Sequence, residues 1–149
     1  MILWRISNHV SLDGDGALRA SARWHTRGRR VGYCAQSPAA ALLETLVHFQ
    51  IDIADLPARY RLLKIDASGT AAFEEVALGE LPKDWIENTS VTRSIGDAWL
   101  AEARSALLIV PSAIVPETYN LLLNPAHADA GGVRIVDVRE HVIDPRLIT

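Results

Sequence analysis

The segment of residues 31–51 holds a single side chain that is fully charged at pH 7, Glu44. Its first part, residues 31–36, has the composition of a short strand. The Ser-Pro pair at 37–38 then suits the N-cap and first position of a helix, which we expect over residues 38–49. A helix that is apolar on nearly every side is usually buried. The segment therefore predicts a strand leading into a helix that packs into the core of a folded domain.

Glu44 needs an explanation, because an ionised Glu is rarely buried without a partner. One explanation is a structural ion pair with an arginine from the N-terminal part of the chain. The other is a carboxylate kept for binding or catalysis, since perturbed charges collect at functional sites. The residue pattern alone leaves both explanations open.

The remaining strand and helix patterns contain no repeat and no linker. A chain of 149 residues fits one domain, and its 49% of hydrophobic residues can form a core without disulfides or metals. Further strands are predicted over residues 61–67, 106–110 and 133–142, and a second helix over residues 92–103. We therefore expect an α+β fold, with a single compact domain over residues 1–149.

Cysteine and histidine usage argues against disulfide and metal sites. Cys34 is the only cysteine, and we expect it to be buried and unreactive within its strand. The five histidines lack His-x-x-x-His or Glu-x-x-His spacing, so no metal site is predicted. There is no secretory leader pattern and no apolar run of about 18 residues, so we expect a cytoplasmic protein without a membrane span.

The formal net charge of −3 hides an uneven distribution. Residues 1–30 carry six arginines against two aspartates, a local charge of +4, whereas residues 31–149 carry nine basic and 16 acidic side chains, a local charge of −7. The basic N-terminal part predicts an anion site. Direct binding of nucleic acid is not expected, because the rest of the chain is acidic and few aromatic residues lie among the arginines.

Three further side chains could contribute chemistry. Arg23 precedes Trp24 and could bind a phosphate while stacking on the ring, or could simply pack its stem there. Tyr33 could stack on a planar ligand or belong to the core. Ser112 could cap a turn, since no Gly-x-Ser-x-Gly pattern marks it as a hydrolase nucleophile. A solvated, flexible loop is expected for Arg27, Arg29 and Arg30.

An ordered set of motifs spans nearly the whole chain. It consists of Trp4-Arg5, Arg23-Trp24-His25, Val31-Gly32-Tyr33-Cys34-Ala35 leading to Ser37-Pro38 and Glu44, Val110-Pro111-Ser112, and Asn124-Pro125. In this order the motifs resemble the RES-domain family, which is named for its Arg, Glu and Ser residues. The resemblance implies an ADP-ribosyltransferase-like core of mixed β-sheets with flanking helices.

The resemblance also implies an activity and partners. RES proteins are toxins of bacterial type II toxin–antitoxin pairs that attack the nicotinamide–ribose bond of NAD⁺, by hydrolysis, by phosphorolysis or by ADP-ribosyl transfer to a protein. NAD⁺ would be the substrate, and no metal would take part. The usual partner is an Xre-type helix-turn-helix antitoxin that blocks the active site, and a homodimer is common. We therefore expect a growth-inhibiting, NAD⁺-consuming enzyme.

The family's functional residues match individual positions of this chain. Its Arg, Tyr, Glu and Ser match Arg23, Tyr33, Glu44 and Ser112, and an N-terminal Arg that lines the family's pocket matches Arg5. Glu44 would stabilise the positive charge that develops on the ribose, as a carboxylate does in glycoside hydrolysis. Arg23 and Arg5 would hold the pyrophosphate. Tyr33 would stack on the nicotinamide, and Ser112 would hydrogen-bond its amide or the ribose.

Two positions depart from the family pattern, and one has no clear role. His25 stands where the family often has Asn, and Ala22 replaces a common Gly. Both departures concern the turn around Arg23 rather than the chemistry. Asn124 fits a late Asn-Pro pattern without an evident function.

Two other functions stay open at the level of sequence. One is a nucleic-acid-directed toxin that cleaves RNA with the help of the arginine-rich N-terminal part. The other is a non-catalytic module that only binds the antitoxin, against which the retention of Arg23, Tyr33, Glu44 and Ser112 argues.

Overall fold

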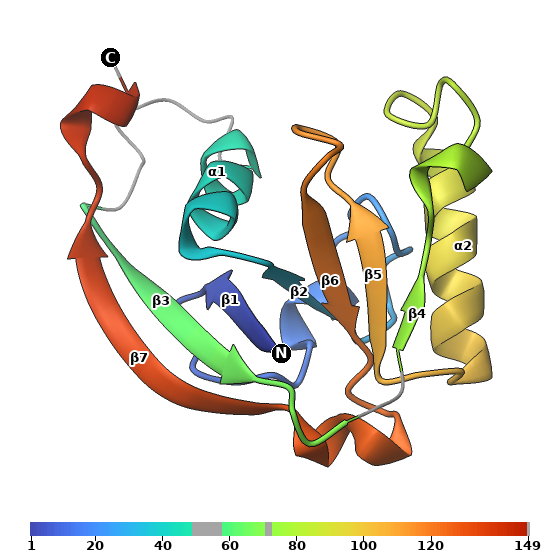
Figure 1. Cartoon of the computed structure of the whole chain (residues 1–149), viewed down its shortest axis with the longest axis horizontal. Helices are drawn as coiled ribbons and strands as arrows, with labels where there is room; N and C mark the ends of the chain where they lie inside the picture. The colour runs from blue at the N-terminus through green and yellow to red at the C-terminus, as the bar shows by residue number, and fades with distance from the viewer. Residues whose placement is uncertain (49–57, 71–72, 149) are drawn as a thin grey trace.

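A computed structural model describes residues 1–48, 58–70 and 73–148 of the chain. In these ranges seven strands form one sheet in the order β4-β5-β6-β2-β1-β3-β7 (Figure 1). The strands are β1 (Ile2–Ile6), β2 (Gly32–Ala35), β3 (Arg59–Asp66), β4 (Phe73–Glu75), β5 (Leu107–Pro111), β6 (Tyr119–Leu123) and β7 (Arg134–Val142). The helices are α1 (Pro38–His48) and α2 (Thr89–Glu102), and short 3₁₀ turns lie at Asp15–Leu18, Leu78–Glu80, Ala128–Gly132 and Pro145–Ile148.

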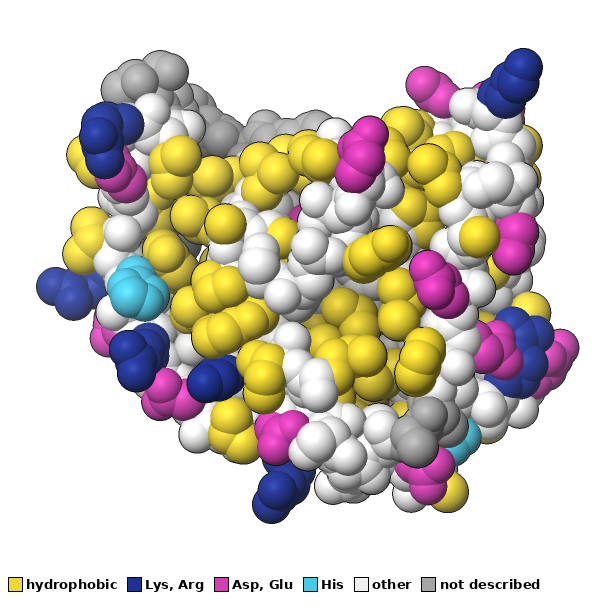
Figure 2. Space-filling view, in the orientation of Figure 1, with side chains coloured by type: hydrophobic (Ala, Val, Ile, Leu, Met, Phe, Trp, Pro, Cys, Tyr) yellow, Lys and Arg dark blue, Asp and Glu magenta, His cyan; other side chains and the backbone are white. Residues whose placement is uncertain are grey.

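Neighbouring strands of the sheet are antiparallel, except that β4 and β5 run parallel. The sheet curves strongly, and α1 packs against β1 and β2, while α2 lies alongside β4 and β5 (Figure 1). On the face seen in Figure 2, hydrophobic side chains gather across the middle and charged side chains stand around the edge.

The two faces of the sheet carry separate apolar clusters, because side chains alternate along each strand. The helix-side core packs strand residues against the buried tryptophans and includes Trp24, Trp85, Trp99, Val110 and Leu122. The far-side core includes Leu3, Cys34, Leu63, Ile65 and Leu123. Leu3, Leu63, Ile65, Trp99 and Leu122 are at most 1% exposed, so both faces are well covered.

The predicted α+β fold class is confirmed, since the described residues form a single mixed sheet with two helices. The first helix is observed over Pro38–His48, and the last predicted residue, Phe49, lies outside the described residues. The expectation that this helix is buried in the core is wrong, because only Ala41 of it is buried and Leu43 and Val47 are 39% and 43% exposed. The second helix begins at Thr89, three residues before the predicted start. Cys34 is buried, as predicted.

The sequence patterns did not predict β1, β4 and β6. β4 has only three residues and pairs with β5 alone, so its own pattern carries little signal. Neither helix in the described ranges is long and apolar enough to cross a bilayer.

Candidate active site

Glu44 projects from α1 towards the ends of β5 and β6. The hydroxyl of Ser112, which follows β5, donates to Glu44 Oε1 at 2.6 Å. The side-chain amide of Asn120 on β6 donates to the same oxygen at 2.9 Å. α1 reaches this position because β2 leads directly into it, and the Ser37 hydroxyl caps its first turn by accepting from the Ala40 N–H at 3.1 Å.

Ser112 is 2% exposed, and its hydroxyl proton has a defined direction. Its oxygen accepts from the backbone N–H groups of Ile114 at 3.1 Å and Val115 at 3.3 Å. Since those lone pairs are taken, the hydroxyl proton is directed at the Glu44 carboxylate. This places Ser112 against Glu44 as its immediate partner.

A cavity of about 240 Å³ opens beside the Glu44 carboxylate. Its lining is mostly small or uncharged and consists of Gln36, Ser37, Ala39, Ala40, Leu43, Glu44, Ser112, Val115 and Thr118. Within the described ranges Glu44 makes no ion pair, and its partners are the neutral Ser112 and Asn120. The structural ion pair considered as one explanation for Glu44 is therefore not observed.

Tyr33 lies on the same face of the sheet as this cluster. Ala35 pairs with Asn120, and Tyr33 pairs with Leu122, so the side chains of all four point to the helix side. Tyr33 is half-buried against the helix-side core. Asn120, which contacts the Glu44 carboxylate, and Leu122, which lies opposite Tyr33, are two residues apart on β6 and share the helix side of the sheet.

The Tyr33 hydroxyl is fixed by the segment that carries Arg23. It accepts from the Trp24 backbone N–H at 3.3 Å and lies 2.7 Å from His25 Nδ1. His25 is 1% exposed, and its Nε2 must carry a proton because it lies 3.1 Å from the Ala17 carbonyl oxygen. In the tautomer that carries its proton on Nε2, the His25 ring accepts at Nδ1 and the Tyr33 hydroxyl is the donor. Burial raises the pKa of Tyr33 above its ordinary value, so this donor keeps its proton.

Arg23 is held from two directions without an acidic partner. Its Nη1 donates to the Ile86 carbonyl oxygen at 2.7 Å, and its guanidinium stands 5.8 Å from the centre of the Trp85 ring. The Thr92 hydroxyl donates to the Arg23 carbonyl oxygen at 2.6 Å. Among the residues described, no carboxylate forms an ion pair with Arg23. A guanidinium fixed in this way keeps several N–H donors for an anion.

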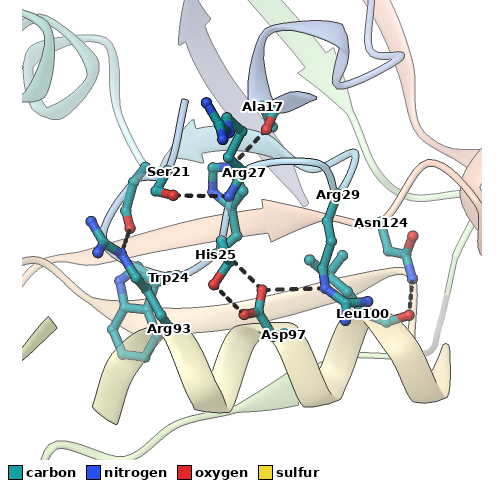
Figure 3. A network of polar contacts seen from close by, with 12 residues as sticks. Ala17, Ser21, Trp24, His25, Arg27, Arg29, Arg93, Asp97, Leu100 and Asn124 are labelled. Atoms are coloured by element: carbon teal, nitrogen blue, oxygen red, sulfur yellow. Dashed lines mark hydrogen bonds and ion pairs between the residues drawn. The ribbon is translucent and has the colours of Figure 1, made fainter. Parts of the chain in front are cut away.

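Asp97 of α2 ties down the chain after His25 (Figure 3). Its carboxylate accepts from the Thr26 backbone N–H at 2.9 Å and from the Thr26 hydroxyl at 2.6 Å. Arg29 Nε lies 3.6 Å from the same carboxylate, and Arg30 pairs with Asp15 at 3.3 Å. The expected flexible loop is therefore anchored at these two arginines, although their side chains are half exposed.

α2 also packs directly on the backbone of the Arg23 segment. Arg93 Nε donates to the Ala22 carbonyl oxygen at 2.7 Å (Figure 3). A Cβ at Gly96 would lie 1.7 Å from the Trp24 carbonyl oxygen, so only glycine permits this approach. The turn itself is closed by the Ala22 N–H, which donates to the His25 carbonyl oxygen at 3.2 Å.

Arg5 is not brought together with Glu44. On β1 it pairs with Leu63 of the far-side core, and its Nη1 lies 3.3 Å from where a Cβ of Gly32 would stand. Gly32 in turn pairs with Leu123, which also belongs to the far-side core. Arg5 thus projects from the opposite face of the sheet, where its buried Nη1 has no partner among the described residues.

Asn124 is buried and forms hydrogen bonds with backbone groups of the fold. It is 2% exposed, accepts from the Ala126 N–H at 3.1 Å and lies 3.5 Å from the Leu100 carbonyl oxygen at the end of α2 (Figure 3). No group of three or more potential metal ligands occurs in the ranges that the structure describes.

Sequence reasoning missed three residues of this arrangement: Asn120, Arg93 and Asp97. Asn120 borders the apolar run Leu121–Leu123, and only the register with β2 shows that it faces Glu44. Asp97 is one of several acidic residues in the second half of the chain, and nothing local marks its contact with Thr26. The structure thus holds a fixed carboxylate beside a cavity, and Tyr33 lies on the same face of the sheet, whereas neither Tyr33 nor Arg23 is among the residues that line this cavity. A carboxylate fixed in this way can stabilise a developing cation.

Several known proteins are similar to this chain in sequence. Residues 2–145 match the family model of the RES domain. The chain is 44% identical over 147 residues to "Toxin Res" of Pseudomonas putida, covering 99% of both chains. It is 39% identical over 155 residues to "Prs ADP-ribosylating toxin" of a Sphingobium species, covering 97% of this chain and 95% of the relative.

A solved structure has a similar fold. The crystal structure of the M. tuberculosis MbcT-MbcA toxin-antitoxin complex aligns with a TM-score of 0.77 and 21% identity, covering 98% of this chain and 85% of the other. With the family model matching almost every residue and full-length relatives well above 30% identity, the chain belongs to the RES-domain family.

Proposed function

We propose that this protein is the toxin of a toxin–antitoxin pair and that it inhibits growth by cleaving the nicotinamide–ribose bond of NAD⁺. The observation that carries the proposal is the Glu44 carboxylate, held by Ser112 and Asn120 beside a cavity and on the same sheet face as Tyr33. The names of the relatives, "Toxin Res" and "Prs ADP-ribosylating toxin", support the same class of activity.

The chemistry requires a carboxylate that does not move. When the bond between ribose C1′ and the nicotinamide nitrogen breaks, its electron pair leaves with the nicotinamide, which becomes neutral. The ribose is left as an oxocarbenium-like cation, and an anionic oxygen beside it lowers the energy of that state. Glu44 supplies this oxygen, because hydrogen bonds from Ser112 and Asn120 already fix its orientation.

Tyr33 and Arg23 bind the two parts of the substrate on either side of the ribose. The half-buried Tyr33 ring is fixed through its hydroxyl and stacks on the nicotinamide. Arg23 binds the pyrophosphate. Its guanidinium is held by the Ile86 carbonyl oxygen, and its own carbonyl oxygen accepts from the Thr92 hydroxyl. Arg5 has no part in this proposal, because it projects from the opposite face of the sheet.

The acceptor of the ADP-ribosyl group is water, phosphate or a protein side chain. The Sphingobium relative is named as an ADP-ribosylating toxin, which favours a protein acceptor for at least part of the family. By analogy with the toxin–antitoxin complex of similar fold, the partner is an antitoxin, and we propose the Xre helix-turn-helix type. Action in the cytoplasm and assembly as a homodimer complete the proposal.

The test is to incubate the purified protein with NAD⁺ and to identify the products by chromatography and mass spectrometry. Parallel reactions contain phosphate buffer, phosphate-free buffer, or phosphate-free buffer with a bacterial lysate. Free nicotinamide is expected in at least one reaction, together with ADP-ribose, its phosphate adduct or a labelled protein. Absence of nicotinamide from all three reactions, with folded protein, would refute the proposal.

A further inference from the structure

The side-chain amide of Asn120 is oriented with its NH₂ group towards the Glu44 carboxylate. Its Nδ2 donates to Glu44 Oε1 at 2.9 Å, and its Oδ1 is buried without a hydrogen-bond partner among the described residues. A buried acceptor left without a donor is unfavourable, so the orientation must be favoured by the other end of the amide. That end is the contact with the carboxylate.

Turning the amide over would not relieve this cost. The exchange would place Oδ1 against Glu44 Oε1, and two acceptors at hydrogen-bond distance repel each other when the carboxylate is ionised. The observed orientation therefore keeps a donor against Glu44 Oε1. With Nδ2 bonded to the carboxylate, Asn120 Oδ1 is left buried without a donor among the described residues.

The two donors to Glu44 converge on one of its oxygens. Ser112 and Asn120 both bond Oε1, from the end of β5 and from β6, and no described residue donates to Oε2. A single donor would leave the carboxylate free to turn about its last bond, because that torsion is broad. Two donors from separate strands fix its plane and leave Oε2 as the oxygen available to a ligand.

We propose that Asn120 is a positioning residue which, together with Ser112, holds Glu44 so that Oε2 faces the reacting ribose; this inference rests on the proposed NAD⁺ cleavage. Asn120 acts through Glu44 and does not touch the substrate, since its free Oδ1 is buried. Its contribution is to the rate of bond cleavage more than to the binding of NAD⁺.

The test compares Asn120→Asp, Asn120→Ala and, as a matched control, Asn8→Asp at an exposed position. The Asp variant keeps the shape of the side chain but replaces the donor with a second carboxylate beside Glu44. We expect kcat for nicotinamide release to fall roughly 100-fold in the Asp variant and roughly 10-fold in the Ala variant, within the range that the loss of one hydrogen bond to a charged group produces. KM for NAD⁺ should change much less, and Asn8→Asp should behave as the unsubstituted protein.

The pH dependence separates positioning from a purely structural role. A neighbouring carboxylate disfavours ionisation of Glu44, so activity of Asn120→Asp should be lost at a higher pH on acidification than activity of the unsubstituted protein. A structural role would instead lower the melting temperature and the active fraction without moving this profile. If Asn120→Asp does not fold, the kcat-against-KM comparison on Asn120→Ala decides the question.

Unchanged kcat and an unchanged pH profile in a folded Asn120 variant, with an active unsubstituted protein, would overturn this inference alone. An unsubstituted protein that releases no nicotinamide would overturn the proposed function, and the inference with it.

Discussion

Replacing Gly96 with Ala tests whether α2 positions the Arg23 segment. In an exposed helix interior the change would stabilise the protein by about 1 kcal/mol. Here the new Cβ would lie 1.7 Å from the Trp24 carbonyl oxygen and 2.8 Å from its carbonyl carbon. Backbone atoms cannot rotate away, so the helix and the segment must separate, at a cost of about 3 kcal/mol or more. The expected net loss of unfolding free energy is about 2 kcal/mol.

Thermal denaturation followed by circular dichroism measures this effect. A loss of about 2 kcal/mol corresponds to a fall in Tm of about 4–8 °C for a domain of this size. Ser94→Ala, at an exposed position of the same helix, is the matched control and should leave Tm nearly unchanged. Because the displaced segment carries Arg23 and the groups that hold Tyr33, KM for NAD⁺ should rise roughly tenfold, which corresponds to about 1.4 kcal/mol. A Gly96→Ala protein as stable as Ser94→Ala would refute the packing argument.

Three further changes have expected outcomes. Ser112→Ala removes the 2.6 Å hydrogen bond to Glu44, which contributes about 1.5–3 kcal/mol when the acceptor is charged. Nicotinamide release should therefore slow roughly 10- to 100-fold. An unaltered rate would contradict the role of Ser112 in holding Glu44. Because burial raises the pKa of Tyr33, the folded state keeps a proton that the unfolded state loses near pH 10, and stability must decline as the pH rises above about 10. Thermal scans of Tyr33→Phe should show a shallower alkaline decline than the unsubstituted protein, and parallel declines would argue against it. Burial raises the pKa of Cys34 to about 11, so a thiol reagent at pH 8 should label it only after unfolding in guanidinium, and rapid labelling of the native protein would contradict the packing of β2.

The first helix and its carboxylate could be predicted because their signals are local. A Ser-Pro pair marks the helix start, and a single charge in an apolar segment marks Glu44. The long alternating strand β7 was predictable for the same reason, whereas β4 has three residues and depends on its neighbour. Cys34 lies within a predicted strand and is buried as expected.

The partners of the site residues could not be predicted, because they depend on strand register and helix packing. Asn120 faces Glu44 only because Ala35 pairs with it across β2 and β6. Arg5 matches a family position, yet its strand parity places it on the face opposite Glu44. Alternation along β1 predicts that Trp4 and Arg5 point to opposite faces, but not which face α1 covers.

The most direct test of the central claim is the rate of nicotinamide release from NAD⁺ by the unsubstituted protein and by Glu44→Gln. The Gln side chain keeps the size of Glu44 and can still accept from Ser112 and Asn120, so the fold should survive with a similar Tm. Loss of the negative charge should slow release by about 100- to 1000-fold or more, the range found when a preorganised electrostatic group is removed. A Glu44→Gln protein that releases nicotinamide at the unsubstituted rate would contradict the assignment of Glu44 as the catalytic carboxylate.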